Sequence, residues 1–278
     1  MSAAAARLAG RLAPVAVASL LGWAAAARAG AQPQQLTVTP DVALSLPGLT
    51  APVLHRDVVR ERLPSRERLD LGPLSTRIGL AAFDLADDGT PLFVLEGWEM
   101  LDGVGLVGPA DVVARDGESY VVELDGTVVG VPPGVAIDGL AEVGPGSFLL
   151  SFDTAVTLPG GVVAQDEDVV LASGGAFSIA VDLTGIVPDG LDLDGLDRSS
   201  DGAVWYFSFD GSGRLGGVPF DDEDIVAWDG AWSLFYDADA VDPAWAAVDL
   251  AAFSVLPRGI FADGFESGDV AAWSAATP

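Results

Sequence analysis

The sequence predicts an all-β protein in which four four-stranded antiparallel repeats close into a small, four-bladed β-propeller-like ring. Three observations predict this fold class: a tandem repeat of about 57 residues, apolar and polar residues that alternate within each repeat, and Asp-Gly pairs where turns are needed. Stacked four-stranded β-sheets are the alternative architecture that the same repeat allows.

The repeat is defined by hydrophobic anchors at Leu80, Ile137, Leu193 and Leu250, which are spaced 57, 56 and 57 residues apart. Each anchor is followed after nine residues by a glycine. The first three are followed after 31 residues by Asp-Val-Val or Asp-Ile-Val, and after 37 by a second glycine. Landmarks that keep register over three periods indicate a duplicated structural unit. We place the repeat domain at 36–258, with repeats at about 36–79, 80–136, 137–192 and 193–249 and a closing strand at 250–256.

Each repeat is expected to form four short strands. In the copy that opens at Ile137, period-2 alternation predicts strands at about 140–143, 148–152, 169–172 and 177–181, with a longer link at 154–167 between the second and the third. Asp-Gly pairs at 88–89, 116–117, 201–202 and 229–230 predict two-residue hairpins with type I′ turns.

The two ends of the domain are expected to share one blade. The segments 42–46, 57–62 and 66–71 are predicted to be its last three strands, and 250–256 to supply the missing first strand. Joining them would complete the ring and leave no open strand edge.

The first 31 residues have the pattern of a cleaved signal peptide. Arg7 and Arg11 precede an apolar run at 12–27, and small residues at 27–31 fit a signal peptidase site. The run is shorter than the roughly 20 residues that span a bilayer, and the chain has no cysteine for a lipid anchor. We therefore expect an exported protein without a transmembrane segment after signal cleavage.

The charge of the chain limits its partners. All 13 basic residues are arginines, and three of them lie in 1–31, which leaves ten against 41 acidic residues. Such a surface repels nucleic acid and anionic lipid and attracts divalent cations. Solubility in an extracellular medium is the alternative explanation for this charge.

Two segments resemble known exported proteins. The repeat, with Asp-Leu-Asp-Gly-Leu at 192–196 and Asp-Asp-Glu-Asp-Ile-Val at 221–226, resembles the propeller-type repeats of uncharacterised secreted bacterial proteins over 42–256. That resemblance implies a fold and no activity. The C-terminal tail at 259–278, with Phe-Ala-Asp-Gly-Phe-Glu-Ser-Gly-Asp at 261–269 and Trp273, is similar to a motif on many exported Gram-negative proteins. It implies a location in the periplasm, on the surface or outside a Gram-negative cell, and either a sorting tag or the remnant of a further strand.

Two acidic loops are candidate Ca²⁺ sites because they occupy equivalent positions in successive repeats. Closely spaced carboxylates suit Ca²⁺, which takes six to eight oxygen ligands. The competing interpretation is that the last Asp of each loop, which recurs as Asp57 and Asp111, caps the loop through backbone N–H groups. Ca²⁺ is the one cofactor for which the sequence offers candidates. These metal candidates are Asp166, Glu167, Asp168, Asp221, Asp222, Glu223 and Asp224.

The last complete repeat is rich in aromatic residues. Alternation assigns about half of them to the core between blades. Trp228, Trp232 and Trp245 lie nearer to predicted turns, so they are the candidate surface residues for a ligand such as an extracellular glycan.

No catalytic signature is present. The chain has a single histidine, His55, no cysteine and no Gly-x-Ser-x-Gly sequence. We therefore expect a non-catalytic protein that presents a binding surface for a carbohydrate, a protein or Ca²⁺. One alternative is a structural, envelope-associated protein with a sorting tail. The other is a carboxylate-dependent polysaccharide hydrolase, because 41 acids always place some pair close together.

Overall fold

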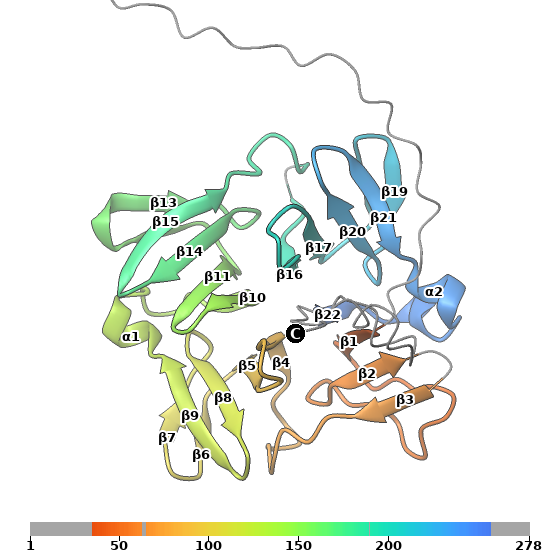
Figure 1. The fold of residues 1–278 in the computed structure, drawn as a ribbon, viewed down its shortest axis with the longest axis horizontal. Helices are drawn as coiled ribbons and strands as arrows, with labels where there is room; N and C mark the ends of the chain where they lie inside the picture. The colour runs from red at the N-terminus through yellow and green to blue at the C-terminus, as the bar shows by residue number, and fades with distance from the viewer. Residues whose placement is uncertain (1–34, 63–64, 189, 257–278) are drawn as a thin grey trace, which may run out of the picture. The chain divides into compact units, whose positions relative to one another are not determined.

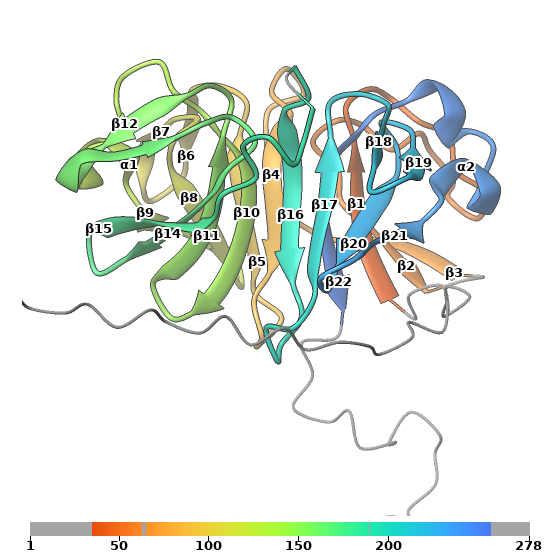
Figure 2. The ribbon, with the colours of Figure 1, turned by 90° about the horizontal axis from the view of Figure 1, so that it is seen from above.

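The computed structural model describes residues 35–62, 65–188 and 190–256, which form a ring of four four-stranded antiparallel sheets (Figures 1 and 2). The predicted all-β, four-bladed propeller is thereby confirmed. The predicted signal peptide at 1–31 and the tail motif at 259–278 lie outside the described residues. Among the residues described, no helix has the length and apolar character that crossing a membrane requires.

Three blades are each built from one continuous repeat. They are the second, third and fourth blades in chain order. In each of them the first strand lies nearest the ring centre and the fourth strand lies outermost. The second blade contains β4 (Leu80–Leu85), β5 (Pro91–Leu95), β8 (Val112–Asp116) and β9 (Ser119–Leu124); the third contains β10 (Ile137–Gly144), β11 (Ser147–Phe152), β14 (Val169–Ser173) and β15 (Ala176–Val181); the fourth contains β16 (Leu193–Arg198), β17 (Trp205–Phe209), β20 (Ile225–Trp228) and β21 (Trp232–Tyr236).

The first blade closes the ring with strands from both ends of the domain. Its order is β22 (Leu250–Leu256), β1 (Gln35–Pro40), β2 (Val59–Arg62) and β3 (Ser65–Arg68). The predicted strand at 42–46 is wrong, because Leu44 makes only an isolated bridge to Val53. The second strand of this blade is β1, which pairs with β22 from Leu36↔Val255 to Thr39↔Ala252.

The link between the second and third strands of each continuous blade holds an extra two-stranded hairpin that the sequence did not predict. One-turn helices α1 (Gly126–Val129) and α2 (Ala238–Val241) follow β9 and β21. The hairpins are β6 (Glu99–Leu101) with β7 (Gly105–Val107), β12 (Val156–Leu158) with β13 (Val162–Ala164), and β18 (Gly213–Leu215) with β19 (Val218–Phe220).

The Asp-Gly pairs do lie at strand connections, but the type I′ prediction is wrong. A type I′ turn needs a positive φ at both central residues, and only glycines have a positive φ in the described chain. In the β8–β9 connection Asp116 pairs with Ser119, so Gly117 and Glu118 are the central residues and only Gly117 has a positive φ, of 57°.

The hydrophobic core lies between the blades. Four apolar clusters occupy the four junctions between neighbouring sheets, and the anchors Leu80, Ile137, Leu193 and Leu250 are completely buried. Small residues two positions after each anchor let adjacent inner strands approach. At Gly139, for example, a Cβ would lie 2.8 Å from Leu196 Cδ2 of the next inner strand.

Polar side chains four positions after three of the four anchors connect neighbouring inner strands. Asp84 accepts a hydrogen bond from the Glu142 N–H on β10 (2.7 Å), and Asp197 accepts one from the Val255 N–H on β22 (2.6 Å). Ser254 Oγ accepts from the Leu85 N–H on β4 (3.3 Å) and donates to Asp84 (2.8 Å). Because all three side chains are buried and hydrogen-bonded, they hold the ring together without exposing unpaired polar groups.

A buried ionic network joins the first blade to the fourth. The Arg66 guanidinium contacts Glu61 at 2.7 Å and Asp242 at 2.9 Å, and the Tyr236 hydroxyl donates to Glu61 at 2.6 Å. Burial and the adjacent Glu61 raise the pKa of Tyr236, so its hydroxyl keeps its proton and remains a donor. Arg66 of β3 therefore helps to dock the first blade on the fourth.

Candidate functional site

Acidic side chains gather at the end of the ring where the inner strands begin. Asp192 and Asp194 flank the anchor Leu193, Asp138 follows Ile137, and Asp249 precedes Leu250. We call these four residues the acidic mouth. They influence one another electrostatically and are also influenced by acids on the surrounding loops. These neighbours are Asp41, Asp153, Asp166, Asp210 and Asp222.

The recurrent Asp at the end of each loop caps that loop, as one of the two sequence interpretations predicted. Its carboxylate accepts a hydrogen bond from the backbone N–H three residues earlier in all four blades, at 3.0 Å for Asp57, 2.7 Å for Asp111, 2.9 Å for Asp168 and 3.0 Å for Asp224. In the last three, the second oxygen accepts from a further backbone N–H. These carboxylates hold the loops that surround the mouth.

A second set of acids connects the second strand of each blade to the start of its inner strand. Asp153 accepts from the Ala136 N–H at 2.8 Å, and Asp210 accepts from the Asp192 N–H at 2.9 Å. Asp41 and Glu96 make the same contact in the other two blades, at 3.1 and 3.2 Å. Most acids around the mouth therefore have a backbone donor.

The acidic mouth differs because three of its four carboxylates each bury one oxygen that has no donor. Asp192 Oδ1, Asp194 Oδ2 and Asp249 Oδ1 have essentially no accessible surface and no hydrogen-bond partner. The other oxygen of Asp194 accepts from Ser208 at 2.7 Å, and Asp138 accepts from Ser151 at the same distance. A buried carboxylate oxygen without a donor is costly when it is ionised.

The pKa values follow from this environment. Burial, and secondarily the neighbouring acids, raises the pKa of Asp192 and of Asp249 to about 7. The same causes place the pKa of Asp138 and of Asp194 well above the usual range for aspartate. The mouth can therefore gain free energy by taking up protons or another positive charge.

The candidate Ca²⁺ loops lie beside the mouth. Asp166 is close enough to raise the pKa of Asp192, and Asp222 does the same for Asp249. Burial raises the pKa of Glu223 to about 7, and Glu223 is only 4% exposed. Burial also raises the pKa of Glu167. Within the described parts of the chain, no three His, Cys, Asp or Glu side chains are already grouped to hold a metal ion. Ca²⁺ binding by these loops stays a prediction.

All four mouth residues were missed by the sequence interpretation. Each stands next to a repeat anchor, and that position was the available signal. Asp194 belongs to strand β16, and Asp192 directly precedes it.

The three candidate tryptophans have different environments. Trp245 is completely buried in the cluster between the first and fourth blades, so its expected surface position is wrong. Trp228 and Trp232 are half-buried and pack against each other, with ring centres 6.3 Å apart. Ligand binding by this pair stays a prediction.

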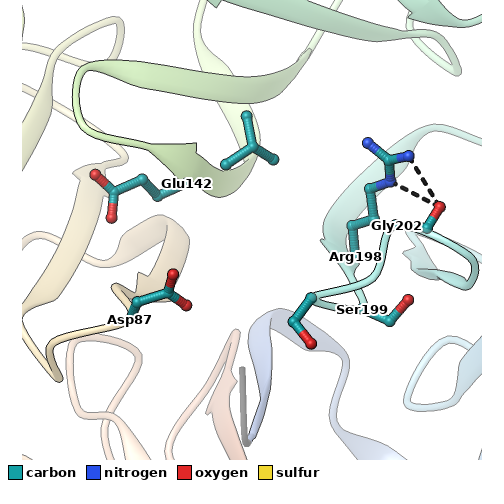
Figure 3. Close-up of a pocket in the computed structure, with 7 residues that line it drawn as sticks. Asp87, Glu142, Arg198, Ser199 and Gly202 are labelled. Atoms are coloured by element: carbon teal, nitrogen blue, oxygen red, sulfur yellow. Dashed lines mark hydrogen bonds between the residues drawn. The ribbon is translucent and has the colours of Figure 1, made fainter. Parts of the chain in front are cut away.

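The opposite end of the ring carries a small pocket of about 160 Å³ (Figure 3). Asp87 and Glu142 lie on one side of it and Arg198 on the other. The Arg198 guanidinium donates to the Gly202 carbonyl at 2.9 and 3.1 Å and lies 4.6 Å from the Trp205 ring centre. Arg198 is thus already held by the protein, and the pocket combines both signs of charge.

Comparison with known proteins gives structural likeness alone. No known family matches the chain, and no curated protein is detectably similar in sequence. Solved structures of propeller type are similar to it. Examples are a Bacteroides caccae protein of unknown function (10% identity, TM-score 0.30, 73% of this chain and 57% of that one), a putative TolB from Agrobacterium tumefaciens (14%, 0.32, 73% and 62%), and the β-propeller domain of Cps50 (Swd1) from Myceliophteria thermophila (12%, 0.30, 66% and 52%). The chain therefore spans between half and two thirds of the length of these structures, and at such low similarity they give no argument about its activity.

Proposed function

We propose that this protein is an exported, non-catalytic binding propeller that takes up a positively charged ligand at the acidic mouth. The observation that supports this is the set of three buried carboxylate oxygens without donors, on Asp192, Asp194 and Asp249. A structural acid would be expected to have a donor, as the loop-capping and strand-connecting acids do. The export and the sorting role of the tail are parts of this proposal that rest on the sequence.

The ligand chemistry that the mouth favours is a cation. Calcium suits it best among metal ions, because it accepts variable numbers of oxygen ligands, and Asp166 and Asp222 add negative charge beside the mouth. The mouth carboxylates would have to turn toward the ion, since they are not grouped as a metal site beforehand. An ammonium or guanidinium group is the other source of the same charge.

The test is thermal unfolding of the purified protein in EDTA and then with millimolar Ca²⁺, Mg²⁺ or agmatine. A ligand that binds the folded state at about 100 times its Kd stabilises it by roughly 2.7 kcal/mol. We expect the Tm to rise by several degrees with Ca²⁺ and less with Mg²⁺. A rise with agmatine alone would assign the mouth to organic cations.

The test variant and the control variant each lose two negative charges, so they have the same net charge. Asp192→Asn/Asp194→Asn is expected to abolish the ligand-dependent rise. Asp116→Asn/Asp229→Asn removes two exposed acids from the β8–β9 and β20–β21 connections and should leave the ligand-dependent rise in Tm unchanged. An equal response of both variants, or no response of the wild type to any of the three cations, would contradict the proposal.

A further inference from the structure

An exposed apolar patch lies on the extra hairpin of the second blade. Trp98, Met100 and Leu106 are 62%, 67% and 58% exposed, and we call them the Trp98 patch. Met100 on β6 pairs directly with Leu106 on β7, so the two side chains share one face of the hairpin. Trp98 precedes Met100 by two residues and is placed on the same face. Three large apolar side chains are thus concentrated on one short hairpin.

The other blades show that the fold does not require this patch. At the position of Met100 and Leu106, the third blade has Thr157 paired with Val163. The fourth blade has Arg214 paired with Pro219. Because equivalent hairpins form with polar or smaller residues, the apolar residues of the second blade need an explanation other than folding. Contiguous exposed apolar residues of this kind mark interaction sites.

The Trp98 ring is held in place by the backbone beneath it. A Cβ on Gly108 would lie 2.7–2.9 Å from three carbons of that ring, so the ring packs directly on this glycine. The Gly108 N–H in turn donates to the loop-capping Asp111 at 2.7 Å. A ring positioned in this way loses little conformational freedom when a partner covers it.

A hollow of about 450 Å³ adjoins the patch. Met100 lines it together with Pro73 and Tyr120, and the Tyr120 hydroxyl is bound to the Leu71 carbonyl at 2.9 Å. The hollow is large enough for an apolar side chain of a partner.

The charges around the patch define the partner's chemistry. Asp102 lies at the hairpin turn and lines the hollow, and Glu99 is near enough to raise the pKa of Tyr120. Arg115, whose guanidinium lies 4.8 Å from the Tyr120 ring centre, is the nearby cation and is half-buried. On a chain with a net charge of −28, this rim favours a partner of positive charge.

We propose that the Trp98 patch is a docking surface for a partner protein segment that carries apolar side chains next to Lys or Arg. Apolar contact supplies the affinity, because aromatic residues and Met are enriched at interface centres. The acidic rim selects basic partners and accelerates their encounter. The surface is separate from the acidic mouth, so this proposal does not depend on the cation that binds there.

The experiment uses three labelled twelve-residue peptides and measures their binding to the purified protein by fluorescence anisotropy. One peptide alternates Lys and Leu, the second alternates Lys and Ser, and the third alternates Glu and Leu. The Lys-Ser peptide reports the non-specific attraction of a cation to an acidic protein. We expect the Lys-Leu peptide to bind at least tenfold more tightly than either of the others.

The matched variant is Met100→Thr/Leu106→Val, which copies the Thr157–Val163 pair that the third blade already accommodates. We expect it to remove the tenfold advantage of the Lys-Leu peptide while the Tm stays unchanged. Val163→Thr, a change at the equivalent exposed hairpin, should keep the advantage. The proposal is overturned if the advantage survives in the first variant, or if the Glu-Leu peptide binds as tightly. It is also overturned if the wild type sediments as a dimer that this variant dissociates, because the patch would then hold a second copy of the chain.

Discussion

At the scale of single residues, the acidic mouth makes stability depend on pH. An aspartate in the unfolded chain titrates near 4, whereas Asp192 and Asp249 titrate at about 7 in the folded protein. Between these values the folded state binds more protons than the unfolded state. The free energy of unfolding contributed by these groups therefore falls as the pH rises from about 4 to about 7.

Asp192→Asn tests this directly because asparagine keeps the shape and removes the charge. We expect a small effect near pH 4 and a gain that grows until about pH 7. At pH 8 it should reach roughly 2 kcal/mol, after allowance for solvent screening. Denaturant unfolding across the pH series measures it. A gain that is equal at all pH values would show that the Asp192 charge is not the cause.

The ionic network between the first and fourth blades gives a second prediction at this scale. Arg66→Met leaves the buried Glu61, which is 2% exposed, without its cation, so we expect a loss of about 3–5 kcal/mol. Arg60→Met breaks the pair with the exposed Glu67, where the nitrogen–oxygen distance is 3.0 Å, and should cost at most about 1 kcal/mol. Urea titrations of both variants compare the two. Similar losses would mean that the network does not join the blades.

At the scale of the strands, the inner strands depend on residues without side chains. A Cβ at Gly139 would overlap Ser151 Oγ and press on Leu196, and Ser151 Oγ is fixed by hydrogen bonds to Asp138 and to the Leu193 carbonyl. We expect Gly139→Ala to destabilise the protein by about 1–3 kcal/mol, measured by chemical denaturation. Gly97→Ala is the control, because no atom lies within 4 Å of the Cβ position there. Gly97→Ala should be neutral or slightly stabilising, since Ala reduces the conformational entropy of the unfolded chain, so equal losses in the two variants would contradict the packing explanation.

Most strands could be predicted because each repeat copies the same alternation. The strand predicted at 42–46 failed for a reason that the repeat itself contains. The Leu-Pro-Gly of 46–48 matches that of 158–160, whose leucine is the last residue of β12. Residues 44–46 therefore correspond to the first strand of an extra hairpin, and 35–40 correspond to the second strand of the blade. The extra hairpins have only three residues per strand, too few for a period to be recognised.

The candidate site was less predictable than the fold because it depends on distances across blades. The sequence identified the acidic loops, and Asp166 and Asp222 do lie near the mouth. It could not show which carboxylate oxygens are buried without a donor, as Asp192 Oδ1 is, because burial and donors depend on strand ends that meet in three dimensions. Trp98 was missed because a single Trp between Gly97 and Glu99 gives no periodic signal.

At the scale of the whole ring, no blade holds a core of its own. Every large apolar cluster lies at a junction between two sheets, and the four inner strands are connected through Asp84, Asp197 and Ser254. A linear array of repeats can unfold piecewise from its ends. This ring has no end within 35–256, because β22 pairs with β1 and completes the first blade. Unfolding is therefore expected to involve all four blades together.

Phe253→Ala tests this cooperativity at the closing strand. Phe253 is 1% exposed and packs between the first and fourth blades, close to Gly195 of β16. Removing its ring should cost about 3–5 kcal/mol. We expect one urea transition, displaced as a whole, with coincident curves from tryptophan fluorescence, which reports mainly on the fourth blade, and from far-UV circular dichroism. Val163→Ala, at an exposed position of the β12–β13 hairpin, should change stability by less than about 0.5 kcal/mol. Two separate transitions in Phe253→Ala would mean that the blades unfold independently and that closure by β22 does not make the ring a single cooperative unit.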